Sequence, residues 1–165
     1  MTQEKIRAAV YSQEKLADGV YSMWLTAETI AKAAAPGQFI AVYTNDNARL
    51  LPRPISICET DAANGRLRLV YRIAGEGTRQ FSLCRPGEVL EIMGPLGNGF
   101  PLKEKKALLI GGGIGIPPML ELAKKLSCEK TAVLGYRDSQ TFLAEEIGTY
   151  AGLAIATEDG SVGTK

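Results

Sequence analysis

The fold of this chain is decided by the stretch Ala107-Leu-Leu-Ile-Gly-Gly-Gly-Ile-Gly-Ile-Pro-Pro118. Its apolar residues 107–110 predict a buried parallel strand, and the pattern from Pro117 to Leu126 predicts a helix. A strand, a glycine turn and a helix N-terminus together form a cradle for phosphate, because backbone N–H groups and the helix dipole favour an anion there. Glycine lets the backbone approach a pyrophosphate closely. A plain strand-to-helix turn without a ligand has the same pattern.

Length and composition predict one large or two small domains with an ordinary hydrophobic core. The chain has 165 residues, is 45% hydrophobic and carries a net charge of +1 from 19 basic and 18 acidic residues. This balance gives no electrostatic reason to expect nucleic acid or an anionic membrane as a partner. No apolar run approaches the roughly 20 residues of a membrane-spanning helix. The start Met1-Thr-Gln-Glu-Lys-Ile-Arg7 lacks the apolar core of a signal peptide, so we expect a cytoplasmic protein.

Two residue types restrict the chemistry. The chain has no histidine, which excludes histidine bases, histidine metal ligands and the serine-histidine-acid triad. Its cysteines, Cys58, Cys84 and Cys128, are widely spaced and form no CxxC pattern, so we expect reduced, buried thiols and no metal site. What remains is carboxylate, lysine or thiol chemistry, or a reaction carried by a bound cofactor, and no residue is assigned a catalytic role.

The first hundred residues have the pattern of short strands separated by turn signals. The clearest strand is Arg66–Ile73, in which apolar and mostly basic residues alternate, and Ala63-Asn-Gly65 predicts a hairpin turn before it. A short helix is predicted over Gly77–Leu83, with Phe81 facing the core. The other predicted strands are Ile6–Tyr11, Val20–Thr26, Gln38–Tyr43, Arg53–Glu59 and Val89–Met93. Regular short strands joined by turns favour a closed or nearly closed β-barrel.

The pattern changes after the polar stretch Pro101-Leu-Lys-Glu-Lys-Lys106, which we interpret as a linker. Beyond it the predicted elements are strand 107–110, helix 117–126, strand 131–135, helix 139–148 and strand 153–157. This alternation is typical of a parallel sheet. The predicted fold is therefore a β-barrel domain over residues 1–100 followed by an α/β domain over residues 101–165. Because a doubly wound nucleotide-binding domain normally has about five or six strands, we expect an incomplete α/β domain and a chain that is a fragment or an incomplete gene product.

The barrel region carries two candidate anion sites. Arg53-Pro-Ile-Ser56 stands at a strand start, where arginine offers a planar charged fork to phosphate or an aromatic ring, and the serine offers a hydroxyl. An edge strand with a surface arginine has the same pattern, and its proline fits that alternative. Gly75-Glu-Gly-Thr78 lies between a strand and a short helix and offers N–H groups and a hydroxyl. A threonine cap after a glycine turn is the alternative there.

The order of these motifs is more informative than any one of them. Two anion sites on two domains suggest two phosphate-bearing cofactors that face each other across a cleft. The order resembles the ferredoxin–NADP reductase superfamily, in which a flavin-binding barrel precedes a nicotinamide-nucleotide domain. Within it, essentially the whole chain looks most like the electron transfer subunits of dihydroorotate dehydrogenase B. The segments that carry this resemblance are Arg53-Pro-Ile-Ser-Ile-Cys58, Val70–Thr78, Glu91-Ile-Met-Gly-Pro-Leu-Gly-Asn-Gly-Phe100, Leu109–Met119 and Thr157-Glu-Asp-Gly-Ser161.

The resemblance implies an FAD site on the barrel. In that family the Arg-Pro-x-Ser segment binds FAD, with the arginine at the pyrophosphate and the serine near the isoalloxazine ring. The strand after it would offer backbone and ring contacts to the flavin, and the Gly-Thr pair would hold the pyrophosphate. The residues implied are Arg53, Pro54, Ile55, Ser56, Val70, Tyr71, Arg72, Gly77 and Thr78.

The resemblance also implies an NAD site on the α/β domain. Its pyrophosphate would be received by Gly111, Gly112, Gly113 and Gly115. Gly135-Tyr-Arg-Asp138 would lie near the adenosine ribose, where Asp138 favours NAD and Arg137 instead accommodates a phosphate, and the sequence does not decide between them. Family members carry a 2Fe-2S cluster on four cysteines of a C-terminal segment, and a late Cys-Gly-Pro strand end that faces the nicotinamide. This chain has neither segment, so no cluster is assigned to its residues.

The function that the resemblance implies is an oxidoreductase subunit of de novo pyrimidine (UMP) biosynthesis. Electrons from dihydroorotate, oxidised in an FMN-containing catalytic partner subunit, would pass through iron–sulfur to FAD on this chain and then to NAD+. Two alternatives stand beside it. One is a subunit of another flavin oxidoreductase of the superfamily, of the sulfide dehydrogenase or NADP transhydrogenase type. The other is a truncated flavin-binding scaffold without turnover.

Overall fold

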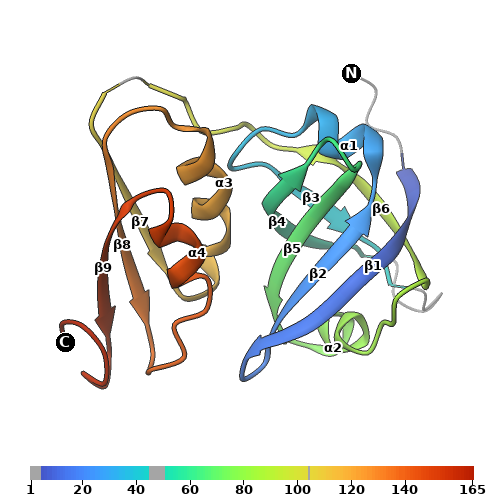
Figure 1. The fold of residues 1–165 in the computed structure, drawn as a ribbon. Coiled ribbons are helices and arrows are strands. Elements are labelled where there is room, and N and C mark those ends of the chain that lie inside the picture. Colours follow the sequence, from blue (N-terminus) through green and yellow to red (C-terminus); the bar gives the residue numbers. More distant parts are fainter. Residues whose placement is uncertain (1–4, 45–50, 104) are drawn as a thin grey trace.

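The computed structural model describes residues 5–44, 51–103 and 105–165, which form a β-barrel and an α/β unit lying side by side (Figure 1). The barrel is closed, with antiparallel neighbours in the order β1-β2-β5-β4-β3-β6. Its strands are β1 (Lys5–Ala17), β2 (Val20–Thr26), β3 (Phe39–Val42), β4 (Arg53–Asp61), β5 (Arg66–Arg72) and β6 (Val89–Leu96). Two short helices, α1 (Glu28–Ala33) and α2 (Glu76–Ser82), lie in its connections.

Side-chain alternation fills the barrel interior. On β5, Leu67, Leu69 and Tyr71 are buried inside the barrel, as the sequence pattern predicted. Phe81 of α2 is buried there as well, edge-on to Tyr71 with 6.2 Å between the ring centroids. The same cluster includes Ala8, Val10, Met23, Leu25, Ile40, Val42, Ile55, Ile57, Leu90 and Ile92.

The α/β unit is a parallel sheet with both of its helices on one face. The strands are β7 (Ala107–Gly112), β8 (Lys130–Tyr136) and β9 (Gly152–Thr157), in that order. A 3-10 turn, η1 (Gly113–Gly115), connects β7 to α3 (Pro117–Lys125), and α4 (Ala144–Gly148) precedes β9. Both helices lie between the sheet and the barrel (Figure 1). No helix in the described part of the chain is both long and apolar enough to cross a membrane.

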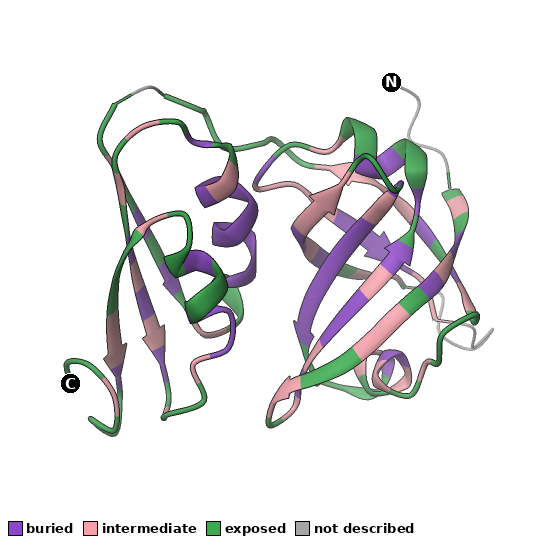
Figure 2. Ribbon diagram, in the orientation of Figure 1, coloured by how far each residue is buried: buried purple, intermediate pink, exposed green. Residues whose placement is uncertain are grey.

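The barrel and the α/β unit share a core. The sequence pattern places Arg68 and Val70 on the outer face of β5, yet both are buried. The α/β unit lies against this side of the barrel (Figure 2), where Arg68 hydrogen-bonds to Glu146 of α4 and α3 packs on β4. Val20, Cys58 and Val70 from the barrel belong to the same apolar cluster as the interior of the α/β unit. The two units are therefore packed against each other.

The predicted fold class, a β-barrel followed by an α/β unit, is confirmed, and the differences from the predicted elements are local. The predicted helix 139–148 is shortened to α4, because Leu143 takes a left-handed conformation (φ 64°) and the Asp138 carboxylate accepts the N–H of Gln140. Strand β1 extends past the predicted end at Tyr11 to Ala17. Two bulges and a run of polar residues interrupt its apolar alternation, so the sequence pattern did not reveal this part of the strand. Helix α1 was not predicted, since six residues are too few for a helical period. Of the interpreted linker, Glu104 lies outside the described residues.

The cysteines are in part as predicted. All three are free thiols, and Cys58 is buried, whereas Cys84 and Cys128 are half-buried. Burial strongly raises the pKa of the Cys58 thiol, so it stays protonated at neutral pH. The expectation of three buried thiols is corrected to one.

The barrel core gives a stability prediction. Ile92→Val should lower the free energy of unfolding by about 0.5–1.5 kcal/mol, because it removes one methylene from a fully buried side chain. The matched control is Ile110→Val on β7, where the side chain is 69% exposed and the change should stay within about 0.5 kcal/mol. Chemical denaturation of the three proteins measures both values. Equal losses at the two positions would contradict this description of the core.

Candidate functional site

The two candidate anion motifs of the barrel meet in space. Arg53 begins β4, and Gly77 lies in the first turn of α2. A Cβ added at Gly77 would lie 2.7 Å from Nε of Arg53, so glycine leaves the room that the guanidinium occupies. Arg53 Nη1 donates a hydrogen bond to the Leu51 carbonyl (2.7 Å), which orients the fork. The first N–H groups of a helix have no i−4 partner within it, and here the first turn of α2 lies beside a positive side chain.

The Thr78 hydroxyl is engaged with its own loop. Its Oγ accepts the N–H groups of Ala74 (2.9 Å) and Gly75 (3.2 Å), and it donates to the Gly75 carbonyl (3.0 Å). This arrangement matches the capping alternative for the Gly-x-Gly-Thr motif. What Thr78 retains for a ligand is its backbone N–H in the first helical turn.

The neighbouring strands β4 and β5 divide the remaining predicted residues between two faces. Ile55 and Tyr71 face the barrel interior, and the Tyr71 hydroxyl donates to Gln13 Oε1 (2.9 Å). These two residues can therefore offer a ligand outside the barrel only their backbone. Val70 is covered by the α/β unit. Arg72 at the end of β5 is exposed, as is Pro54, and Ser56 is half-buried.

The glycines that connect β7 to α3 have different surroundings. A Cβ at Gly111 would lie 3.1 Å from both Ile116 Cα and Met119 Cγ, so a side chain here would press on the start of α3. Gly113 has a left-handed φ of 51°, and a Cβ there would lie 4.0 Å from Nη2 of Arg72. At Gly112 and Gly115 a Cβ would meet nothing within 4 Å. The backbone at these two residues is open to a ligand, as a phosphate cradle requires.

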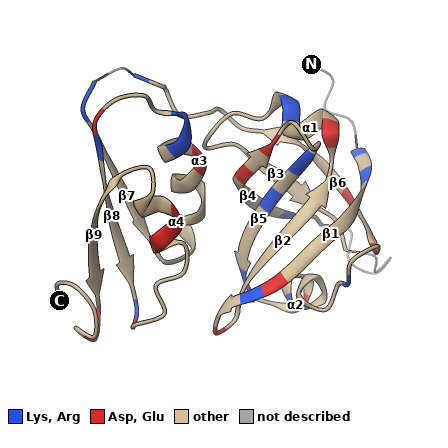
Figure 3. Cartoon of the chain, viewed as in Figure 1, with Lys and Arg blue, Asp and Glu red and all other residues tan. Residues whose placement is uncertain are grey.

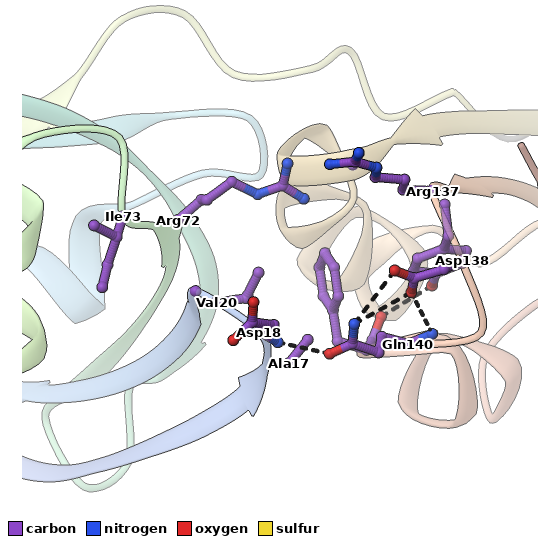
Figure 4. A pocket seen from close by; sticks show the side chains of 12 residues that line it. Ala17, Asp18, Val20, Arg72, Ile73, Arg137, Asp138 and Gln140 are labelled. Carbon is purple, nitrogen blue, oxygen red and sulfur yellow. Dashed lines mark hydrogen bonds between the residues drawn. The ribbon is translucent and has the colours of Figure 1, made fainter.

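A pocket of about 250 Å³ lies between the barrel and the carboxyl ends of β7 and β8 (Figure 4). Arg72 from the barrel and Arg137 from the end of β8 point into it from opposite sides. Ligands of open α/β sheets bind at this edge, and two guanidinium groups suit an anionic one. The pocket is lined by Ala17, Asp18, Gly19, Val20, Arg72, Ile73, Gly113, Tyr136, Arg137, Asp138, Gln140 and Phe142.

One side of the pocket is closed by a bridge between the two units. Asp138 accepts the backbone N–H of Gln140 at 2.9 Å, and the Gln140 side chain accepts the N–H of Asp18 at 2.7 Å (Figure 4). Sequence reasoning missed Asp18 and Gln140. An Asp-Gly pair at 18–19 is a hairpin signal, but nothing in it indicates that the turn reaches the α/β unit.

Acid–base and metal chemistry gain no support from this pocket. The Tyr136 hydroxyl donates to the Phe142 carbonyl (2.9 Å), and burial raises its pKa, so it stays protonated at neutral pH. Within the described ranges, no three histidine, cysteine, aspartate or glutamate residues gather as metal ligands. The cationic groups at these two places are guanidinium groups: Arg72 and Arg137 line the pocket, beside the carboxylates of Asp18 and Asp138, and Arg53 lies beside Gly77.

A closed antiparallel barrel followed by a parallel sheet is the architecture of ferredoxin reductase-type oxidoreductases. The chain belongs to the family described as oxidoreductase FAD-binding domain, whose model matches residues 9–100. It therefore carries the FAD-binding domain of an oxidoreductase.

The comparisons with known proteins extend beyond the barrel. A protein of Listeria monocytogenes serotype 4b (strain F2365) is 42% identical over 94% of this chain. One of Geobacillus kaustophilus (strain HTA426) is 39% identical over 96%. Both are named dihydroorotate dehydrogenase B (NAD(+)), electron transfer subunit, and the chain spans 64% and 65% of their lengths. An NADH-dependent reduced ferredoxin-NADP oxidoreductase structure superimposes with a TM-score of 0.88 and 28% identity, over 96% of this chain and 59% of that one.

Proposed function

We propose that the chain acts as an electron transfer subunit of dihydroorotate dehydrogenase B. In this role it takes electrons from an FMN-containing catalytic subunit onto FAD and delivers them to NAD+ in pyrimidine biosynthesis. The observation that carries the proposal is that Arg72, the last residue of β5 in the FAD-binding domain, lies beside Gly113 of the glycine turn in one pocket. The names of the two relatives support the identity of the substrate and the partner.

FAD fits the residues at the start of β4 and α2. Arg53 and the first-turn N–H groups at Gly77 and Thr78 would hold the two phosphates, and the missing Cβ of Gly77 leaves the guanidinium in place. Ser56 would offer its hydroxyl to the ring edge. When bound, the flavin supplies the chemistry, because it accepts two electrons and passes them on. The chain's own residues bind and orient it.

We place a nicotinamide dinucleotide at the ends of β7 and β8, beside the pocket that Gly113 lines. Gly112, Gly113 and Gly115 would receive its pyrophosphate, with Arg72 supplying positive charge from the barrel. We propose residues 1–100 as the FAD-binding domain and residues 101–165 as the NAD-binding domain. Arg137 and Asp138 both line the pocket. Contact of Asp138 with a ribose hydroxyl would favour NAD, whereas contact of Arg137 with a phosphate would favour NADP.

A 2Fe-2S cluster does not fit the described residues. The chain has three cysteines, and such a cluster takes four thiolates. Among the described residues, no three cysteine, aspartate or glutamate side chains lie close enough together to hold a metal. No cluster is therefore assigned to the described residues.

The identity of the flavin tests the proposal directly. Protein purified with its flavin should release FAD on denaturation, because two phosphates need both Arg53 and the first turn of α2. Chromatography of the released flavin measures this. In a separate sample of folded protein, anaerobic NADH should bleach the flavin absorbance near ~450 nm. Release of FMN would contradict the FAD assignment, and a flavin that NADH never reduces would contradict the proposed electron path.

A second candidate is a subunit of an NADP transhydrogenase-type flavin oxidoreductase. The superposition at a TM-score of 0.88 on an NADH-dependent reduced ferredoxin-NADP oxidoreductase favours it. The partner distinguishes the two functions. Binding to a dihydroorotate dehydrogenase catalytic subunit supports the first, whereas flavin reduction by NADPH in preference to NADH supports the second.

A further inference from the structure

A charged side chain is buried between the barrel and the α/β unit. Arg68 lies on the outer face of β5 and is only 5% exposed. Its guanidinium donates to both carboxylate oxygens of Glu146 on α4, at 2.5 and 3.2 Å. It also donates to Ser22 Oγ (2.8 Å) and Glu59 (3.4 Å) on the barrel. One side chain thus binds both units, and its paired contact crosses the boundary between them.

Two further polar contacts cross the same boundary. Glu121 of α3 is 1% exposed and accepts the N–H and the hydroxyl of Thr60, at 3.1 and 2.7 Å. Lys124 of α3 donates to Glu59 at 2.5 Å. Charged residues of both signs accordingly lie where α3 and α4 face β4 and β5 (Figure 3). These contacts give the two units a defined relative orientation, because each requires directed hydrogen bonds.

Helix α4 meets Arg68 of the barrel through its Glu146. This helix has five residues and follows Leu143 in a left-handed conformation, so its position comes from tertiary packing. A buried ion pair adds little to stability compared with apolar packing, but a paired guanidinium–carboxylate contact fixes geometry. Strand β5 also connects Arg68 directly to Arg72, which faces Gly113 across the pocket.

We propose that Arg68 is a positioning residue, which acts through Glu146 to hold the glycine turn beside Arg72 at the end of β5. In the part that concerns electron transfer, this inference rests on the proposed function. Loosening the contact should let the α/β unit shift on the barrel and lengthen the path between the two cofactor sites.

Cys58 provides a readout that does not depend on any cofactor. Its thiol is fully buried within the cluster shared by the two units. In a Cys84→Ser, Cys128→Ser background it is the single thiol, and a chromogenic disulfide reagent should react with it slowly. Arg68→Met and Glu146→Gln should each speed this reaction about tenfold, and Arg68→Lys should have a smaller effect because it keeps the charge. The matched control is Glu28→Gln, which breaks an exposed ion pair with Lys32 on α1.

The second readout is reduction of the bound flavin by NADH. In Arg68→Met and Glu146→Gln the rate at saturating NADH should fall about tenfold. The half-saturating concentration should stay within threefold and the flavin content should not change. Unchanged Cys58 labelling in both variants, or equal acceleration in Glu28→Gln, would overturn the inference. So would a wild-type reduction rate in variants with accelerated labelling. If NADH does not reduce the wild-type flavin at all, the proposed function fails, and the labelling alone decides whether Arg68 holds the units together.

Discussion

Replacing Gly115 by valine should weaken NADH binding at least about 100-fold and leave the flavin content unchanged. A Cβ at this residue meets no protein atom within 4 Å, so valine should be accepted by the fold and should project into the proposed cradle. There it would keep the pyrophosphate from the backbone N–H groups. The loss of two charge-assisted hydrogen bonds costs about 1.5–3 kcal/mol each, and each 1.4 kcal/mol is about a factor of ten in affinity. The measurement is the NADH concentration dependence of anaerobic flavin reduction.

Gly111 provides the matched control for this prediction. A side chain there would lie 3.1 Å from Ile116 Cα, so Gly111→Val should lower the free energy of unfolding. The two variants thus separate a ligand-binding glycine from a packing glycine in the same turn. A Gly115→Val protein with the wild-type dependence on NADH would identify the loop as a plain strand-to-helix turn. An unfolded Gly115→Val protein would show that the space beside this residue belongs to the core.

The sequence predicted those parts of the molecule that local patterns determine. Alternation along Arg66–Ile73 predicted a barrel strand with the correct inner face, and the run from Ala107 to Pro118 predicted the strand, turn and helix. The expectation that this strand is buried is corrected, because Leu108 and Ile110 on one face of β7 are exposed. The bounds of β1 and α4 were missed because they depend on bulges and on a left-handed Leu143, which tertiary packing imposes.

The sequence could not predict the contact between the two units. Arg68 and Val70 have the pattern of a solvated outer face, and both are buried where the α/β unit lies against the barrel. The same limit applies to the pocket. Asp18 and Gln140 are 122 positions apart, and their hydrogen bond follows from how the barrel and the sheet lie against each other. The order of the motifs suggested two sites that face each other across a cleft. Only the tertiary structure shows that Asp18 and Gln140 lie between the two units.

Replacing Arg53 by alanine should weaken FAD binding about 10- to 150-fold, because a charge-assisted contact with phosphate contributes about 1.5–3 kcal/mol. The Arg53 side chain extends from the start of β4 to α2, where its guanidinium lies beside Gly77. Arg53→Lys should have an intermediate effect, since it keeps the charge and loses the planar fork. Equilibrium titration of the flavin-free protein with FAD measures each constant.

Riboflavin separates a phosphate contact from a general loss of structure, because it has the isoalloxazine ring and no phosphate. If Arg53 binds the pyrophosphate, its replacement should leave riboflavin binding unchanged while FAD binding falls. Gly77→Ala should act in the same direction, since a Cβ 2.7 Å from Nε displaces the guanidinium. The matched control is Arg79→Ala on the same helix, whose side chain is exposed and lies 3.9 Å from Glu76. Equal losses for FAD and riboflavin in Arg53→Ala would place the effect of this arginine on the fold of the barrel and remove it from the flavin site.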